Sequence, residues 1–185
     1  MIRPIVLYGA PVLRQKASPV SPEDPELPRL IQDLWDTMYN ADGVGLAAPQ
    51  IGVSKKVFVV DARQLQSPEE EPFKGVFINP KILSTDPVCA PYEEGCLSIP
   101  GIRERIYRPV GVEVEYLDEN LVLQRRHFTG IVARVIQHEY DHLIGQLFID
   151  YLSPLKRQLL RRRLKEITAG QVEAPYPLQY VGRAH

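Results

Sequence analysis

Residues 137–145, QHEYDHLIG, place His138 and His142 four positions apart, with Glu139 directly after the first histidine. On a helix, side chains at positions i and i+4 are neighbours whose Cβ atoms lie about 5–6 Å apart. Two imidazoles at that spacing can bind one metal ion, and the intervening carboxylate can act as general base on a metal-bound water. The pattern therefore predicts a metal-binding helix. The alternative is a core helix whose histidines are hydrogen-bonded to backbone carbonyls.

The residues around this motif support a helix whose histidines point inward. Thr129 is a candidate N-cap and Gly145 a candidate stop signal. At about 100° per residue, four side chains fall on one narrow face of this helix and form an apolar stripe that ends in the two histidines. These four are Ile131, Val135, His138 and His142. Asp141 lies on the flank and is expected to be a structural salt-bridge partner.

Two further segments carry side chains suited to a hydrolytic metal site. Residues 94–101, EGCLSIPG, offer Cys96 as a thiolate candidate for the third ligand, in a glycine-flanked turn. Residues 43–52, GVGLAAPQIG, form a glycine-rich loop that contains Gln50, whose neutral amide suits the stabilisation of an oxyanion. A simple turn and a phosphate loop are the alternatives for this loop. A phosphate-binding loop is disfavoured, because the sequence has neither the G-K-[ST] motif nor a strand that leads into G-x-G-x-x-G.

The bulk composition predicts an ordinary globular protein. The 185 residues are 44% hydrophobic and 24% charged, with a net charge of −1, and are expected to form one domain. No apolar run approaches the roughly 18 residues of a membrane span, and MIRPIVLYGA does not read as a signal peptide. With only Cys89 and Cys96, a reduced, cytoplasmic setting is expected. Cys89 is expected to be a small buried residue rather than a fourth ligand.

The periodicity along the chain predicts mixed helices and strands. The strands precede the central helix without strand–helix alternation, which favours an α+β fold with small antiparallel or mixed sheets around the metal-binding helix. The expected elements are a helix over 25–40, strands over 56–60 and 75–78, an exposed loop over 64–73, a hairpin of 110–116 with 121–128, and a last helix that opens at Ser153-Pro154.

The three segments GVGLAAPQ, EGCLS and QHEYDHL, in that order, closely resemble the three motifs of the peptide deformylases. The resemblance includes IRPIVLYGAPVLR near the N-terminus and IDYLSPLKR after the metal helix, and covers roughly residues 1–165. We therefore expect one catalytic domain over 1–168, which includes a basic helix at about 154–168. The tail over 169–185 is left without a predicted role.

The resemblance implies removal of the N-formyl group from the initiator methionine of nascent polypeptides. It implies Cys96, His138 and His142 as metal ligands, Glu139 as catalytic acid and base, and Gln50 with the Leu97 backbone N–H as oxyanion donors. It also implies a set of substrate-binding residues. The methionine pocket is expected from Val44, Gly45, Leu97, Ile131, Arg134 and Val135, with Arg103 on the peptide backbone and Glu94 in the polar frame of the site. For Arg134, simple solvation is the alternative.

These residues allow a hydrolytic mechanism. One thiolate and two neutral imidazoles leave a divalent ion a net charge of +1 and an open fourth position, so it favours a bound hydroxide. Glu139 would take the proton of the water and later deliver it to the departing amine. Mixed nitrogen and sulfur ligands suit Zn²⁺, whereas the resemblance implies Fe²⁺ as the physiological ion; Ni²⁺ or Co²⁺ are alternatives in purified protein.

Two other functions share parts of this pattern. A zincin-type metallopeptidase also carries H-E-x-x-H, but it usually takes its third ligand downstream, where His185 is the one remaining histidine. A non-catalytic zinc-stabilised domain would leave Glu139 without a purpose. His127 and His185 are assigned no role.

The last predicted helix is strongly basic. Its six basic residues are Lys156, Arg157, Arg161, Arg162, Arg163 and Lys165. We expect Leu155, Leu159 and Ile167 to dock on the protein body, so that the charges face outward. Such a face is either simply solvated or binds the ribosome, beside which the formylated end of a nascent chain emerges.

Overall fold

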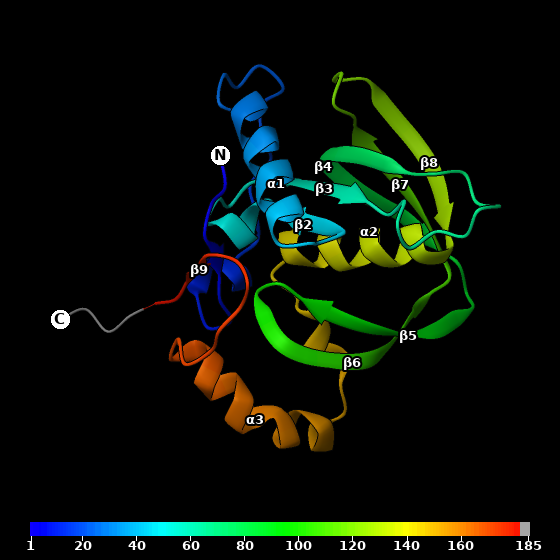
Figure 1. Cartoon of the computed structure of the whole chain (residues 1–185). Helices are drawn as coiled ribbons and strands as arrows, with labels where there is room; N and C mark the ends of the chain where they lie inside the picture. The colour runs from blue at the N-terminus through cyan, green and yellow to red at the C-terminus, as the bar shows by residue number, and fades with distance from the viewer. Residues whose placement is uncertain (182–185) are drawn as a thin grey trace.

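The computed structural model describes residues 1–181, so His185 lies outside the described part of the chain. Within these residues the chain forms three small sheets and three α-helices. Helix α2 lies at the centre, between the largest sheet and the β5–β6 hairpin, as Figure 1 shows. The helices are α1 (Leu27–Asn40), α2 (Gly130–Leu143) and α3 (Pro154–Thr168), and the strands are β1 (Ile5–Val6), β2 (Gly45–Ala47), β3 (Val57–Asp61), β4 (Lys74–Thr85), β5 (Cys89–Cys96), β6 (Ile99–Pro109), β7 (Gly111–Leu117), β8 (Leu123–Thr129) and β9 (Leu178–Gln179). The predicted α+β class, with small sheets around the helix that carries the two histidines, is confirmed.

The largest sheet is antiparallel and has the strand order β2-β3-β4-β7-β8. Its strand β3 is buried on both faces because alternate side chains point to opposite sides of a strand. Phe58 and Val60 pack in the cluster that contains Ile136 of α2. Val57 and Val59 pack in the cluster that contains Leu34 of α1. The sheet thereby fixes α2 on one face and α1 on the other.

Helix α2 begins after Thr129, as predicted, although the threonine hydroxyl makes no capping hydrogen bond. The helix ends at Leu143, and Gly145 follows with a φ of 76°. A side chain at Gly145 would place its Cβ 2.4 Å from the Arg14 carbonyl oxygen, so this position needs glycine for space as well as for its backbone conformation. Glycine is therefore required at the predicted end of this helix partly because the backbone of Arg14, distant in the sequence, packs against it.

A second sheet, the hairpin of β5 and β6, lies on the side of α2 opposite the large sheet (Figure 1). The sequence did not predict it. On β6, Ile99, Ile102 and Ile106 pack in a cluster with Phe148 and Leu160. Through these contacts the hairpin packs against the segment after α2 and against α3. As a result, Cys96 at the end of β5 lies close to α2.

The segment after α2 leads into α3 and then back to the N-terminus. Ser153 caps α3 by accepting a hydrogen bond from the Lys156 backbone N–H at 3.3 Å. The chain then returns, and β9 pairs in parallel with β1. Within residues 1–181, no helix has the length and apolar character that crossing a membrane requires.

Two expectations about packing were wrong. Leu155 and Leu159 of α3 are 67% and 74% exposed and do not dock on the protein body, whereas the expected burial of Ile167 is confirmed and Leu160 is buried beside it. The stripe that docks is thus rotated from the one inferred, because the hairpin lies on the other flank of α3. Cys89 is exposed rather than buried, since it begins β5 at the open end of the hairpin.

Candidate metal centre and active site

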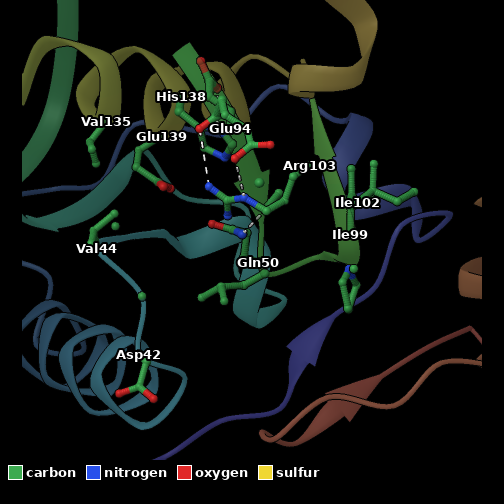
Figure 2. A pocket seen from close by; sticks show the side chains of 18 of the residues that line it. Asp42, Val44, Gln50, Glu94, Ile99, Ile102, Arg103, Val135, His138 and Glu139 are labelled. Carbon is green, nitrogen blue, oxygen red and sulfur yellow. Dashed lines mark hydrogen bonds and ion pairs between the residues drawn. The ribbon is translucent and has the colours of Figure 1, made fainter. Parts of the chain in front are cut away.

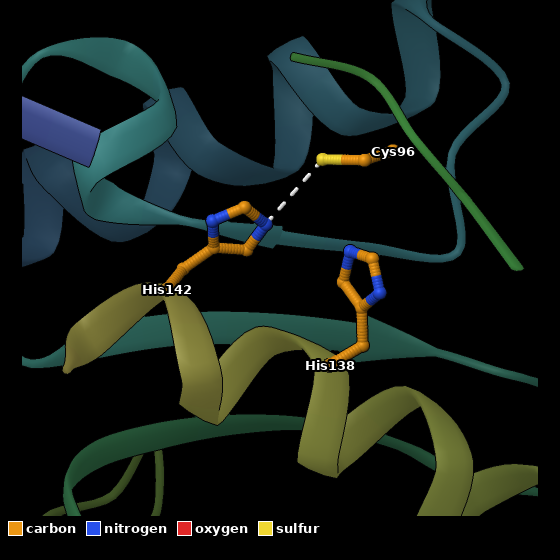
Figure 3. A group of neighbouring side chains, drawn as sticks. All are labelled: Cys96, His138 and His142. Carbon is orange, nitrogen blue, oxygen red and sulfur yellow. Dashed lines mark hydrogen bonds between the residues drawn. The ribbon is translucent and has the colours of Figure 1, made fainter. Parts of the chain in front are cut away.

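The hairpin and the central helix bring three ligand side chains together. The Cys96 sulfur and ring nitrogens of His138 and His142 all lie within 4.8 Å of one another. Figure 3 shows the three side chains, with the two histidines extending from α2 toward Cys96. Cys96 Sγ is 3.5 Å from His142 Nε2. A tetrahedral ion with metal–sulfur and metal–nitrogen bonds of about 2.3 and 2.0–2.1 Å would hold sulfur and nitrogen about 3.5 Å apart. The donor set therefore fits one divalent ion.

Glu94 on β5 orients the first histidine. Its Oε1 lies 2.9 Å from His138 Nδ1, which leaves His138 Nε2 to face Cys96 and His142. Burial opposes the charge on Glu94, but hydrogen bonds with His138 and Arg108 outweigh it and hold the pKa of Glu94 at about 2. The carboxylate is thus ionised at neutral pH, and Glu94 lies in the polar frame of the site.

Two buried arginines neutralise Glu94. Arg108 binds it through two hydrogen bonds of 2.8 and 3.1 Å, and Arg134 through one of 3.0 Å. Arg134 also donates to the carbonyl oxygens of Ile106 and Ala90. The idea that Arg134 is solvated is wrong: its side chain is 9% exposed because the β5–β6 hairpin covers this flank of α2.

The second histidine is buried and electrically neutral. Burial lowers the pKa of His142 well below its ordinary value, and neutral imidazole is the form that binds metal ions. His142 Nδ1 has no hydrogen-bond partner among the described residues. The other ring nitrogen, Nε2, faces Cys96 Sγ, so it is the nitrogen that is available as a metal ligand.

The carboxylate between the histidines is buried beside them. Glu139 is 4% exposed, and its Oε2 has no hydrogen-bond partner among residues 1–181. Burial raises the pKa of Glu139 to about 7. A Cβ at Gly45 would lie 2.7 Å from Glu139 Oε1, so the glycine of β2 makes room for this carboxylate. A carboxyl group of this pKa can both accept and release a proton near neutral pH.

Gln50 approaches the centre from a short 3-10 helix, Ala48–Ile51. Its Oε1 accepts a hydrogen bond from the Ala47 backbone N–H at 3.0 Å, which turns the amide nitrogen toward the site. Nε2 lies 3.2 Å from Ser98 Oγ and 3.5 Å from Cys96 Sγ. The glycine-rich loop is therefore neither a simple turn nor a phosphate loop. It forms the buried strand β2 and the 3-10 helix that orient the Gln50 amide toward the site.

A cavity of about 540 Å³ opens in front of these groups. Figure 2 shows Gln50, Glu94 and Glu139 extending toward its centre from three different elements. Apart from His142, which is buried behind the cavity, every residue that the sequence nominated for the site lines it. These residues are Val44, Gly45, Gln50, Glu94, Cys96, Leu97, Arg103, Ile131, Arg134, Val135, His138 and Glu139. Arg103 lies at the rim, with its side chain 60% exposed.

Other residues of the site were missed from the sequence. Arg108 and Ser98 hold the polar frame, and residues 173–176 of the tail form part of the cavity wall. The register of β5 and β6 places Arg108 opposite Ala90 and Glu94 opposite Glu104, so the long arginine side chain has to reach along the hairpin to Glu94. No periodic signal in the sequence marked that hairpin. Asp141 accepts hydrogen bonds from Arg108 and from the Tyr151 hydroxyl, both at 2.8 Å, which confirms its structural role. His127 contacts Asp86 at 2.8 Å, away from the site.

This combination defines a class of protein. One thiol and two imidazoles on one side of an open cavity, with a buried carboxyl group beside them, are typical of a metal-dependent hydrolase. A closed, purely structural metal site would use four protein ligands and would have no need of the cavity.

Comparisons with known proteins identify the family. The family model described as polypeptide deformylase matches residues 2–158. A peptide deformylase of Flavobacterium johnsoniae is 44% identical over 97% of this chain and 96% of that protein. One of Salinibacter ruber is 45% identical over 96% and 94%. A crystal structure of the Legionella pneumophila peptide deformylase superposes with a TM-score of 0.80 at 42% identity, covering 92% of this chain and 98% of that one.

The chain belongs to the polypeptide deformylase family, as its three motifs predicted. This family consists of metal-dependent hydrolases that remove the formyl group from nascent polypeptides. The predicted enzyme class is therefore confirmed, and a zincin-type peptidase and a non-catalytic zinc domain are set aside.

Proposed function

We propose that this chain hydrolyses the N-formyl group of the initiator methionine at one metal ion held by Cys96, His138 and His142. The observation that carries the proposal is the convergence of these three side chains within 4.8 Å beside a buried carboxyl group, at the wall of a cavity large enough for a methionine side chain. The products are formate and a polypeptide with a free amino terminus.

The metal we propose is Fe²⁺. A thiolate with two imidazoles suits Fe²⁺, Zn²⁺, Co²⁺ and Ni²⁺ by ligand type, and the family resemblance favours ferrous iron. When bound, the ion supplies a Lewis acid that lowers the pKa of water toward neutrality. Metal analysis of protein purified anaerobically, compared with aerobically purified protein, tests the assignment. Zinc in both preparations would contradict it.

Glu139 is the proton carrier in this proposal. It takes a proton from the water as the water oxygen attacks the formyl carbon. It then delivers that proton to the amine nitrogen as the carbon–nitrogen bond breaks, so that the amine leaves in its neutral form. A pKa of about 7 supports both steps near neutral pH. The Gln50 amide and the Leu97 backbone N–H stabilise the negative charge that develops on the formyl oxygen.

The apolar wall of the cavity is the proposed methionine pocket. Val44, Ile131 and Val135 line it from the loop before β2 and from α2. An unbranched, flexible thioether adapts well to such a pocket. Leu97 and Gly45 complete the pocket, and Arg103 at the rim is available for the peptide backbone. Arg134 and Glu94, which bind one another, support the wall.

A peptide assay tests the function directly. Formyl-Met peptides should be hydrolysed, while the same peptides with a free amine should not be, and formyl-Asp peptides should react far more slowly. Glu139→Gln should keep the metal but retain less than about a tenth of the kcat, because general acid–base catalysis is typically worth 10²–10⁴. Cleavage of internal peptide bonds would instead indicate a metallopeptidase.

The ligand assignment has its own test. Cys96→Ala should bind less than one equivalent of metal after dialysis, because two imidazoles alone hold the ion weakly. Cys89→Ala provides the matched control, since Cys89 is the other free cysteine and is exposed at the far end of β5. Full metal content in Cys96→Ala would refute the assignment.

We also propose that α3 contacts the ribosome. Arg157, Arg161 and Lys165 are exposed and have no ion-pair partner within residues 1–181, next to the exposed Leu155 and Leu159. By contrast, Lys156 pairs with Glu104 and Arg162 with Glu166. Phosphate contacts would make binding strongly dependent on salt. Association with ribosomes during synthesis implies a cytoplasmic location, which is part of this proposal.

Co-sedimentation with ribosomes at low and high salt tests this surface. Reversing the charges of Arg157, Arg161 and Lys165 to Glu should abolish recovery at low salt. The control reverses three exposed basic residues elsewhere, Lys16, Arg29 and Arg105. Equal recovery of the two variants would show that α3 is simply a solvated helix.

A further inference from the structure

The turn at the tip of the β5–β6 hairpin is supported from outside. Leu97 and Ser98 connect Cys96 to its partner Ile99. Neither turn residue has a positive φ, whereas the two-residue turns that match the natural twist of a hairpin need one or two residues there with positive φ. This turn is therefore not one of the types that match the natural twist of a hairpin, and contacts from other segments support it.

Three such contacts reach the turn. The Tyr8 backbone N–H donates to the Ser98 carbonyl at 2.9 Å, and the Gln50 amide donates to Ser98 Oγ at 3.2 Å. The third contact comes from the tail: the Tyr176 hydroxyl donates to the Leu97 carbonyl at 2.9 Å. Of the three contacts, only this one is made to Leu97, whereas the other two are made to Ser98.

Tyr176 is well placed to hold the turn firmly. The next residue, Pro177, accepts a hydrogen bond from the Ile5 backbone N–H at 2.8 Å, and the β9 strand that follows pairs with β1. The half-buried tyrosine ring packs with the cluster of α1 and β3 side chains. The preceding residues 173–175, together with Tyr176, line the cavity. This segment lies beyond residues 2–158, which the family model matches.

We infer that Tyr176 is a positioning residue for the oxyanion-binding turn, and that the tail over 173–176 is a functional wall of the active site. The inference rests on the proposed role of the Leu97 N–H. The hydrogen bond to the Leu97 carbonyl restrains the Leu97–Ser98 peptide plane. The plane that carries the Leu97 N–H is joined to it through the two torsion angles of Leu97, so that the restraint limits how far this N–H can turn. Donors that are already oriented stabilise developing charge without reorganisation during the reaction.

Tyr176→Phe removes the hydroxyl and keeps the ring. Its kcat with formyl-Met peptides should fall about three- to tenfold, the equivalent of one neutral hydrogen bond, while KM and metal content stay unchanged. The matched control is Tyr180→Phe. Tyr180 lies in the same tail, is 51% exposed, and packs its ring against Gly170 rather than against the turn. This variant should retain the wild-type kcat.

Hydrogen exchange provides a readout independent of turnover. In Tyr176→Phe, the amides of residues 96–99 should exchange faster, whereas those of α1 and β3 should not change. An unchanged kcat or unchanged exchange at the turn overturns the inference. An equal loss of kcat in both Tyr variants also overturns it, because the tail would then act only by general docking. Failure of the wild-type protein to hydrolyse formyl peptides would instead refute the proposed function, and the exchange result would still show whether Tyr176 holds the turn.

Discussion

Glu94 Oε1 lies 2.9 Å from His138 Nδ1, and the same carboxylate binds the buried Arg108 and Arg134. One side chain thus sets which ring nitrogen of a ligand faces the metal site. It also supplies the counter-charge of Arg134 and shares that of Arg108 with Asp141. The hydrogen bond links β5 to α2 directly beside the ligand set, so the stability of the hairpin and the affinity for metal should be coupled.

Glu94→Gln tests this coupling. The amide keeps the shape of the carboxylate but removes its charge, so metal affinity should fall about 10–100-fold, as is typical when the partner of a metal-bound histidine is lost. The free energy of unfolding should fall by about 3–5 kcal/mol, because the buried Arg134 loses its counter-charge and Arg108 keeps only that of Asp141. Chelator competition and urea denaturation measure the two effects.

The neighbouring Glu93 offers a matched control for that substitution. Its side chain is 68% exposed and makes a 3.5 Å contact with Arg103. Glu93→Gln should leave both metal affinity and stability within the scatter expected of surface changes. Equal losses in the two variants would mean that Glu94 acts only through the net charge of the hairpin.

Gly45→Ala should reduce turnover by displacing the proton carrier. The added Cβ would come within 2.7 Å of Glu139 Oε1 and 2.8 Å of its Cγ, so the carboxyl group must move. We expect the kcat to fall by about 10² or more, with metal content retained. In a Glu139→Ala background the clash is gone, so the same glycine substitution should then cost little in thermal stability. An equal cost in both backgrounds would show that Gly45 is needed for another reason.

The sequence predicted those parts of the molecule that depend on local patterns. The stripe that ends in His138 and His142 identified α2, and turn residues marked the hairpin of β7 and β8. It did not predict the β5–β6 hairpin or the burial of Arg134, because both depend on pairing between distant segments. The docking face of α3 was misassigned for the same reason: which leucines are buried depends on where the hairpin lies, and helical periodicity alone leaves that open.

In the site, too, the residues that belong to local motifs were predicted and those that depend on long-range packing were not. The motifs nominated Cys96, Glu139 and Gln50, and all three line one cavity. Arg108 and Tyr176 were missed because an isolated arginine or tyrosine carries no motif. Their importance arises from a strand register and from the return of the tail to β1, which are both tertiary features.

Asp61 should make the stability of the protein dependent on pH in the acid range. Hydrogen bonds from Arg63 lower its pKa to about 2, with a further hydrogen bond from the Tyr39 hydroxyl at 2.7 Å. Because this folded-state pKa is lower than the ordinary aspartate value of 3.8, the stabilisation is fully present above about pH 4. It is lost as the pH falls toward 2.

Asp61→Asn should therefore be less stable than wild type at pH 7 by about 1 kcal/mol, a modest value because Arg63 is half exposed. The difference should shrink as the pH is lowered from 4 toward 2. Urea denaturation across this range measures it, with Glu69→Gln in the exposed loop as the control. A difference that stays constant with pH would mean that the lost hydrogen-bond geometry, rather than the charge, causes the effect.

Removal of the metal should loosen the hairpin from the central helix. An ion bound by Cys96, His138 and His142 joins the end of β5 to α2, so it stabilises the folded chain only when all three are present. At a metal concentration about 100 times the Kd, binding contributes about 2.7 kcal/mol. For a domain of this size, that corresponds to a Tm shift of about 5–10 °C. A chelator should therefore lower the Tm of the wild-type protein by that amount, and Cys96→Ala should show almost no shift. An equal chelator effect in Cys96→Ala would place the stabilising ion elsewhere in the protein.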